Sequence, residues 1–88
     1  MRVSVLYQSN SEYERPVLEF VHDYEYRTGR KLSLYDLNTR EGAAVASLYD
    51  VMQYPAVIAV ANDGQLLQSW QGGSLPLMND VMYYDQQG

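Results

Sequence analysis

The chain has 88 residues, of which 47% are hydrophobic and none is cysteine, and eleven acidic against six basic side chains give it a formal net charge of −5. This length supports one domain, residues 1–88, and the lack of cysteine excludes disulfide bonds, thiolate catalysis and thiolate metal sites. Because the basic residues are mostly dispersed and no apolar run is long enough for a membrane span or an export signal, we expect a cytoplasmic protein that binds neither nucleic acid nor membrane.

The first two expected elements are a strand over Arg2–Tyr7, in which apolar residues alternate, and a helix. Ser11 followed three residues later by Glu14 is a capping box, in which each side chain accepts a hydrogen bond from a free main-chain N–H of the other residue. The helix should therefore begin at Ser11 and end at Gly29. Pro16 would fall in its second turn, where it kinks the axis or delays the regular helix by a few residues.

The first helix should have one apolar and one acidic face. The acidic side chains between Glu12 and Glu25 form a solvated face or, alternatively, a docking face for a basic partner. We interpret His22 as an exposed helical residue, because a metal site needs several ligands and the chain has no second histidine. The apolar residues with the spacing of one helical face are Tyr13, Val17, Phe20, Val21 and Tyr24.

The middle of the chain predicts a second strand over Lys31–Leu37 and a second helix over Thr39–Tyr49. The strand is apolar and aromatic, and turn and cap residues follow it. Asn38 or Thr39 would cap the helix, which must end before Pro55. The helix would contact the sheet through Ala44, Val45, Leu48 and Val51.

The third strand, Ala56–Ala61, is apolar on both faces, as is typical of a central strand that helices cover on both sides. The turn at 62–64, Asn-Asp-Gly, predicts a hairpin that returns the chain as a fourth strand over Gln65–Trp70. Gly72–Gly73 then ends the strand pattern. The final short helix would have Ser74 as its cap, Pro76 in an early position and Leu75, Met78, Val81 and Met82 as its packing residues.

This order, β-α-β-α-β-β-α, makes a four-stranded mixed sheet with helices on both faces, because the crossovers are right-handed and the hairpin is antiparallel. Together with Tyr54–Pro55 before the third strand, Asp63–Gly64 in the hairpin and Gly72–Gly73 before the last helix, the order resembles the thioredoxin-like superfamily over nearly the whole chain. The resemblance implies an α/β thioredoxin-like fold in which the Tyr54–Pro55 peptide bond is cis.

Members of that superfamily carry Cys-x-x-Cys where the first strand passes into the first helix, and here the window reads Gln8-Ser9-Asn10-Ser11. Gln8 and Ser11 occupy the two cysteine positions, and neither can replace a thiolate in thiol–disulfide exchange. The single histidine, His22, lies about three helical turns away and cannot act as the base for a serine nucleophile. We therefore expect no enzyme activity, no catalytic residue, no metal and no cofactor.

Family members hold extended segments against the residue before the cis-proline, by strand addition that needs no cysteine. The resemblance therefore implies a non-catalytic module that binds a peptide or protein of unknown identity in the groove beside Pro55, rimmed by some of the nine tyrosines. The candidate binding residues are Gln8, Ser9, Asn10, Ser11, Tyr54 and Pro55.

Two alternatives remain open at this stage. The first is a small-molecule or glutathione-type binding protein, or a degenerate transferase, that uses Tyr54 and Gly72–Gly73. The second is an interaction protein similar to the circadian clock protein KaiB, which also has a cysteine-free thioredoxin-like state. A homodimer is also possible, because Tyr83–Tyr84 could form either a contact within the chain or a contact between two copies.

Overall fold

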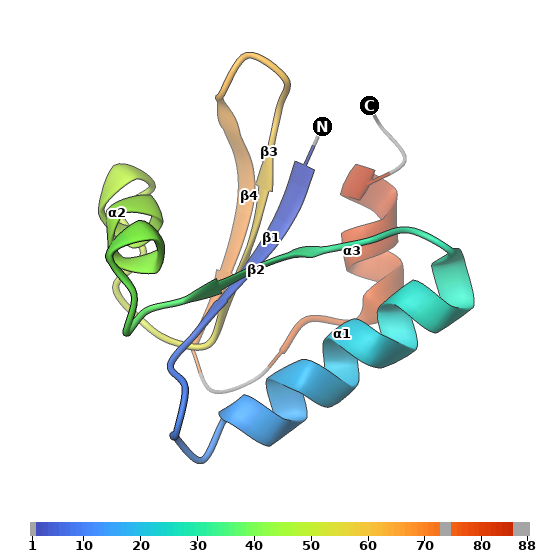
Figure 1. Cartoon of the computed structure of the whole chain (residues 1–88). Coiled ribbons are helices and arrows are strands. Elements are labelled where there is room, and N and C mark those ends of the chain that lie inside the picture. The colour runs from blue at the N-terminus through green and yellow to red at the C-terminus, as the bar shows by residue number, and fades with distance from the viewer. Residues whose placement is uncertain (1, 73–74, 86–88) are drawn as a thin grey trace.

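The computed structural model describes residues 2–72 and 75–85 and contains the expected order of strands and helices (Figure 1). No helix in this part of the chain combines the length and the apolar character that a membrane span requires. The elements are β1 (Arg2–Tyr7), α1 (Glu14–Thr28), β2 (Ser33–Asp36), α2 (Arg40–Leu48), β3 (Ala56–Val60), β4 (Leu66–Gln71) and α3 (Met78–Asp85).

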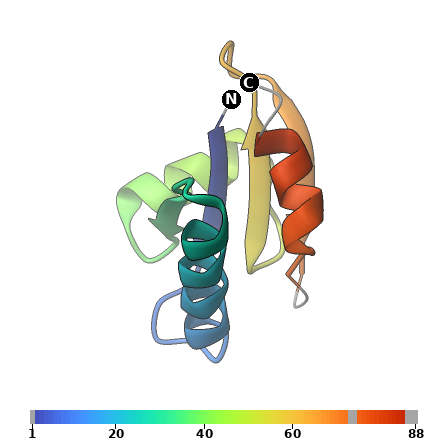
Figure 2. The same ribbon diagram turned by 90° about the vertical axis from the view of Figure 1, so that its right-hand side faces the viewer.

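The four strands form one mixed sheet in the order β2-β1-β3-β4. β1 and β2 are parallel, whereas β1 with β3 and β3 with β4 are antiparallel. Every residue of β3 is buried, as the apolar run predicts for a central strand. Helices α1 and α3 cover one face of the sheet and α2 covers the other (Figures 1 and 2), so the predicted architecture is confirmed.

On the α1–α3 face, alternate residues of β1 and β3 pack against the two helices. The Tyr24 side chain is fully buried, and its hydroxyl donates a 2.6 Å hydrogen bond to Oδ2 of Asp85 at the end of α3. Arg30 Nη1 also donates to the Asp85 carbonyl, at 3.1 Å. The buried cluster comprises Val3, Val5, Val17, Val21, Tyr24, Leu32, Val57, Ala59 and Val81.

The α2 face is held by a shorter helix that lies very close to the sheet. Thr39 caps the helix, since its hydroxyl accepts from the Gly42 N–H at 3.1 Å and donates to the Asp36 carbonyl at 2.6 Å. A Cβ at Gly42 would overlap the main chain of Asp36, so only glycine fits this approach. The buried cluster on this face is Leu6, Ala46, Val51, Ala56, Ile58 and Val60.

The first helix begins three residues after Ser11, within the delay that Pro16 predicts. Residues 11–14 form a turn in which the Glu14 N–H donates to the Ser11 carbonyl at 3.2 Å, and α1 begins at Glu14. No capping box forms, because the Glu14 carboxylate accepts from the Asn10 N–H instead of the Ser11 N–H. Pro16 delays the helix as expected and lies in its first turn, where a missing N–H costs no helical hydrogen bond.

Two further helix predictions need correction. In α2 the residues Ala44 and Leu48 are exposed, because the close contact at Gly42 turns Gly42 and Ala46 toward the sheet instead. Helix α3 begins at Met78, so Pro76 precedes it rather than lying within it. Leu75 packs against the core just before this helix, as predicted. The predicted cap, Ser74, and the residue before it lie outside the described residues.

The hairpin between β3 and β4 forms as predicted. Gly64 has φ +91°, and its N–H donates to the Ala61 carbonyl at 2.9 Å. The Ala61 N–H in turn donates to the Gln65 carbonyl at 2.8 Å, which closes the turn. The pairing of β3 with β4 shifts register between Ala59 and Val60, where β4 carries one extra residue.

Candidate functional site

The loop between β1 and α1 has a defined shape that its own side chains maintain. The Ser11 hydroxyl donates to the Gln8 carbonyl at 2.6 Å and accepts from the Tyr13 N–H at 3.3 Å. The Asn10 N–H donates to Glu14 Oε2 at 3.3 Å. Ser11 therefore stabilises the turn that carries the chain from the end of β1 into α1, instead of capping the helix.

A second network joins this loop to the loop after β2. Asp36 Oδ1 accepts from the N–H of Ser9 at 3.2 Å and from the N–H of Asn38 at 2.9 Å. The Asn38 side-chain amide donates to the carbonyl of Ser9 at 3.0 Å and to its hydroxyl at 2.8 Å. These hydrogen bonds, chiefly the one from Asn38, lower the pKa of Asp36. The sequence signal was an Asp and an Asn two residues apart at a strand end, which is typical of an Asx turn.

Opposite this loop lies the segment that precedes β3. The peptide bond between Tyr54 and Pro55 is cis, and Pro55 is buried. The Pro55 carbonyl accepts from the Gly72 N–H at 3.1 Å, whereas the main-chain N–H and carbonyl of Tyr54 have no hydrogen-bond partner within residues 2–72 and 75–85. The Tyr54 ring is 39% exposed, and its hydroxyl donates to the Val51 carbonyl at 3.2 Å.

Gln71, at the end of β4, fixes the chain just before Tyr54. Its Oε1 atom accepts from the N–H groups of Met52 and Gln53 at 2.9 and 3.2 Å. Its Nε2 atom donates to the Ser69 hydroxyl at 2.9 Å. Sequence reasoning missed Gln71, because nothing in a strand-end glutamine indicates that it binds a segment 18 residues earlier in the chain.

Two adjoining hollows lie beside Tyr54. The first, which we call the Pro55 groove, has a volume of about 280 Å³ and lies between the start of α1 and Pro55. The second, which we call the α2 hollow, measures about 490 Å³ and is walled by Leu37, Ala46 and Val51 among others. Gln8 and Tyr54 line both hollows. The residues of the Pro55 groove are Gln8, Ser11, Glu12, Tyr13, Tyr54 and Pro55.

The structure thus brings together four of the six candidate site residues and leaves two outside. Gln8, Ser11, Tyr54 and Pro55 line the Pro55 groove, but Ser9 and Asn10 do not. Ser9 is held by Asp36 and Asn38 on the other side of the loop. The left-handed turn at Asn10 leaves that residue exposed, away from the lining.

The environment of both hollows is acidic. Glu12 lines the Pro55 groove and Asp50 lines the α2 hollow, and no lysine or arginine is among the described lining residues of either. Tyr7, which ends β1 beside them, has a raised pKa, mainly because it is buried and also because Asp36 and Glu14 are near. A ligand with a positive charge is therefore favoured over an anion.

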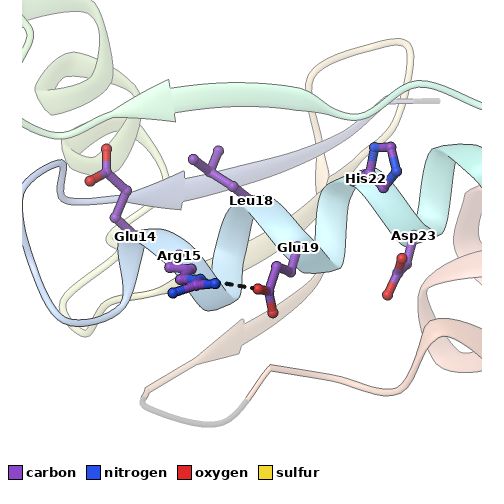
Figure 3. A pocket seen from close by; sticks show the side chains of 6 residues that line it. All are labelled: Glu14, Arg15, Leu18, Glu19, His22 and Asp23. Carbon is purple, nitrogen blue, oxygen red and sulfur yellow. Dashed lines mark hydrogen bonds and ion pairs between the residues drawn. The ribbon is translucent and has the colours of Figure 1, made fainter.

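A third hollow, of about 490 Å³, lies on the outer face of α1, and Figure 3 shows its six lining side chains along that one helix. Arg15 and Glu19 form an exposed ion pair at 3.3 Å. His22 is exposed here, as the sequence predicts, and among the described residues no group of three potential ligands could hold a metal ion. This surface corresponds to the solvated acidic face expected from the sequence.

The fold places this chain in a known structural class. The topology, the helices on both faces and the loop beside Pro55 together define a thioredoxin-like fold, without the Cys-x-x-Cys motif because the chain has no cysteine. Among solved structures, the chain is similar to thioredoxin 1 from the thermophilic eubacterium Thermosipho africanus TCF52B, with a TM-score of 0.68 over 99% of this chain and 92% of that chain. The two are 10% identical, so the likeness shows the fold alone. No family model and no curated protein matches the chain.

Proposed function

We propose that this protein is a non-catalytic binding module that holds an extended peptide or protein segment against Tyr54. The observation that carries the proposal is the main chain of Tyr54, whose N–H and carbonyl have no partner among the described residues and lie beside two hollows. An extended segment that pairs with these two groups gains main-chain hydrogen bonds, as in strand addition.

The two hollows provide sites for side chains of the bound segment. Successive side chains of an extended chain point to opposite sides, so neighbouring residues can enter the Pro55 groove and the α2 hollow on either side of Tyr54. The acidic residues Glu12 and Asp50 favour a basic residue, and the wall formed by Leu37 and Val51 favours an apolar one. The preferred segment therefore combines basic and apolar side chains.

The rigidity of the surroundings supports this role. Asp36 and Gln71 hold the two loops that border Tyr54 through four main-chain N–H groups. Binding by a surface that is already ordered loses less conformational entropy than binding by a flexible loop. The absence of catalysis is also part of the proposal, since Gln8 and Ser11 take the place of the two cysteines. A cytoplasmic location remains a prediction from the sequence.

The test is selection from a random peptide library, followed by titration of the enriched peptides with the wild-type protein and two variants. Gln8→Trp fills the boundary between the two hollows and removes no side-chain hydrogen bond seen in the structure. We expect it to weaken binding by at least about tenfold. His22→Trp adds the same ring to the outer face of α1 and should leave affinity unchanged.

If His22→Trp alone lost affinity for the peptides, the Pro55 groove would be ruled out as the binding site and the outer face of α1 would be favoured. Failure to enrich any peptide would also contradict the proposal. A parallel titration with glutathione separates the small-molecule alternative, which requires saturable amide shifts at Tyr54 and Gly72. Disulfide reductase activity of the wild-type protein would refute the non-catalytic assignment, and Ser11→Cys alone should not create it, because the exchange needs a second thiol.

A further inference from the structure

The edge strand β4 carries neither a charged side chain nor a proline, although it has a bulge near its start, where Leu67 is an extra residue opposite Ala59 and Val60. It is the last strand of the sheet, and the sequence has no charged residue, and no histidine, from Gly64 to Asn79. Exposed edges in soluble proteins are commonly protected by lysine, by proline or by a covering segment. In a chain that is 19% charged, an uncharged edge of this length marks a surface that tolerates close contact.

The register shows which main-chain groups of β4 point outward. The Gly72 N–H donates to the Pro55 carbonyl. In the alternating antiparallel pattern the main-chain N–H and carbonyl of Trp70 therefore also point toward β3, whereas those of Ser69 and Gln71 point away from the sheet. The Ser69 N–H accordingly donates to the side chain of Gln68 at 2.9 Å and not to another strand. The Ser69 N–H must therefore exchange its bond to Gln68 Oε1 for one to a partner strand, whereas the main chain of Gln71 faces outward without such a bond among the described residues.

The two faces beside this edge differ in their cover. On the α1–α3 face, Trp70 packs edge-on against Tyr84 of α3, with ring centroids 5.5 Å apart. On the α2 face, Leu66 is 37% exposed and lines a hollow of about 430 Å³ together with Leu48, which is 71% exposed. Apolar surface thus remains uncovered next to the edge on the α2 side.

We propose that β4 is a self-association edge, through which two copies of this chain pair antiparallel about a two-fold axis at Ser69. The pairing places Ser69 opposite Ser69 and makes the two four-stranded sheets continuous over residues 68–70 of each β4, and the bulge at Leu67, opposite Gln71, ends the regular ladder on each side. The two α2 helices then lie on the same face, with the exposed Leu48 and Leu66 side chains beside the junction.

Charge argues for a second copy as the occupant. Two molecules that each carry a net charge of −5 repel one another, and an antiparallel pair of β4 strands brings only uncharged side chains opposite each other. A strongly basic or acidic partner would find no complementary charge on this edge. The inference concerns a different surface from the Pro55 groove and stands whether or not that groove binds a peptide.

The test uses charge reversal at the proposed axis. Wild type should sediment with a monomer–dimer equilibrium, and Ser69→Lys should weaken dimerisation by at least about tenfold because two like charges would meet. An equimolar mixture of Ser69→Lys and Ser69→Glu should recover dimers, because position 69 faces itself. His22→Lys adds a positive charge on the exposed outer face of α1, away from β4, and should leave the equilibrium unchanged.

Each result bears on the proposal. A wild-type chain that stays monomeric up to its solubility limit would overturn it, as would dimers that Ser69→Lys does not weaken. Failure of the mixture to recover dimers would rule out the axis at Ser69. Because the chain has no cysteine, Ser69→Cys introduces a single thiol, and a short bismaleimide should link two copies much faster through position 69 than through His22→Cys. Equal rates for the two variants would also count against the edge.

Discussion

The two faces of the sheet are stabilised in different ways. On one face, two helices cover a mainly aliphatic buried cluster (Figure 2). The buried Tyr24 hydroxyl joins α1 to the end of α3. On the other face, the single helix α2 packs through glycine and alanine and leaves the sheet near β4 uncovered. Both proposed contact surfaces border this α2 face. The comparison indicates that one face supplies most of the apolar packing, while the other leaves surface for partners.

The largest expected effect concerns the close approach of α2. Gly42→Ala places a methyl group into the main chain of Asp36, which cannot move without disturbing β2 and the loop after it. We expect the free energy of unfolding to fall by about 3 kcal/mol or more. Urea denaturation measures this change. Ala44→Gly, at an exposed position of the same helix, should cost only about 1 kcal/mol through helix propensity.

The next effect concerns the polar contact on the opposite face. Tyr24→Phe removes the 2.6 Å hydrogen bond to the largely buried Asp85 carboxylate, which should reduce the free energy of unfolding by about 2 kcal/mol. Tyr26→Phe removes a hydroxyl from the same helix at a side chain that is 85% exposed and should change little. If Tyr24→Phe reduced the free energy of unfolding more than Gly42→Ala does, the expected order of the two effects would be reversed.

Tyr24 also predicts how stability depends on pH. Burial, and then the hydrogen bond to Asp85, raise the pKa of Tyr24 well above its ordinary value of 10.0. Above pH 10 the unfolded phenol loses its proton first, so the folded state binds more protons and stability falls as pH rises. Denaturation at increasing alkaline pH should show a shallower decline for Tyr24→Phe than for wild type. If the stability of both proteins fell equally with pH, Tyr24 would not be the group responsible.

The smallest effect is expected in the loops beside the groove. The lowered pKa of Asp36 means that its contribution to stability is present above the ordinary value of 3.8 and is lost as pH falls through the lower folded value. The protection of the Ser9 and Asn38 amides, whose N–H groups donate to Asp36, measured against their intrinsic exchange rates, should fall in this acid range more than protection in β3. Asp36→Asn should abolish the pH dependence of exchange at these two amides, whereas Asp23→Asn, on the outer face of α1, should preserve it.

Local patterns predicted most of the architecture, and the errors have physical causes. The apolar run of β3 and the glycine turn at Gly64 depend on neighbours in sequence, and both predictions were confirmed. The capping box predicted at Ser11 and Glu14 does not form, because both side chains bind main-chain groups of the preceding loop and turn instead. The predicted contact face of α2 was right for Val45 and Val51 but wrong for Ala44 and Leu48, because the helix rotation depends on Gly42 meeting Asp36, a tertiary contact that periodicity cannot reveal.

The candidate site was accessible to sequence reasoning only in part. The resemblance placed Gln8, Ser11 and Tyr54 near Pro55, and these residues do line the same groove. Sequence spacing could not show that Ser9 turns toward Asp36, because the two residues come from different strand ends. The support from β4 was invisible for the same reason, as it acts between segments far apart in the chain.

The last residue of β4 connects the two proposed surfaces. The main chain of Gln71 points outward at the free edge, while its side chain accepts the N–H groups of Met52 and Gln53 next to Tyr54. If both proposed contacts form, Gln71 is the residue through which they would be thermodynamically linked, because it belongs to one surface and supports the other. Such linkage is reciprocal: if pairing of two copies changes the affinity for a peptide by some factor, the peptide changes the dimerisation constant to a matching extent.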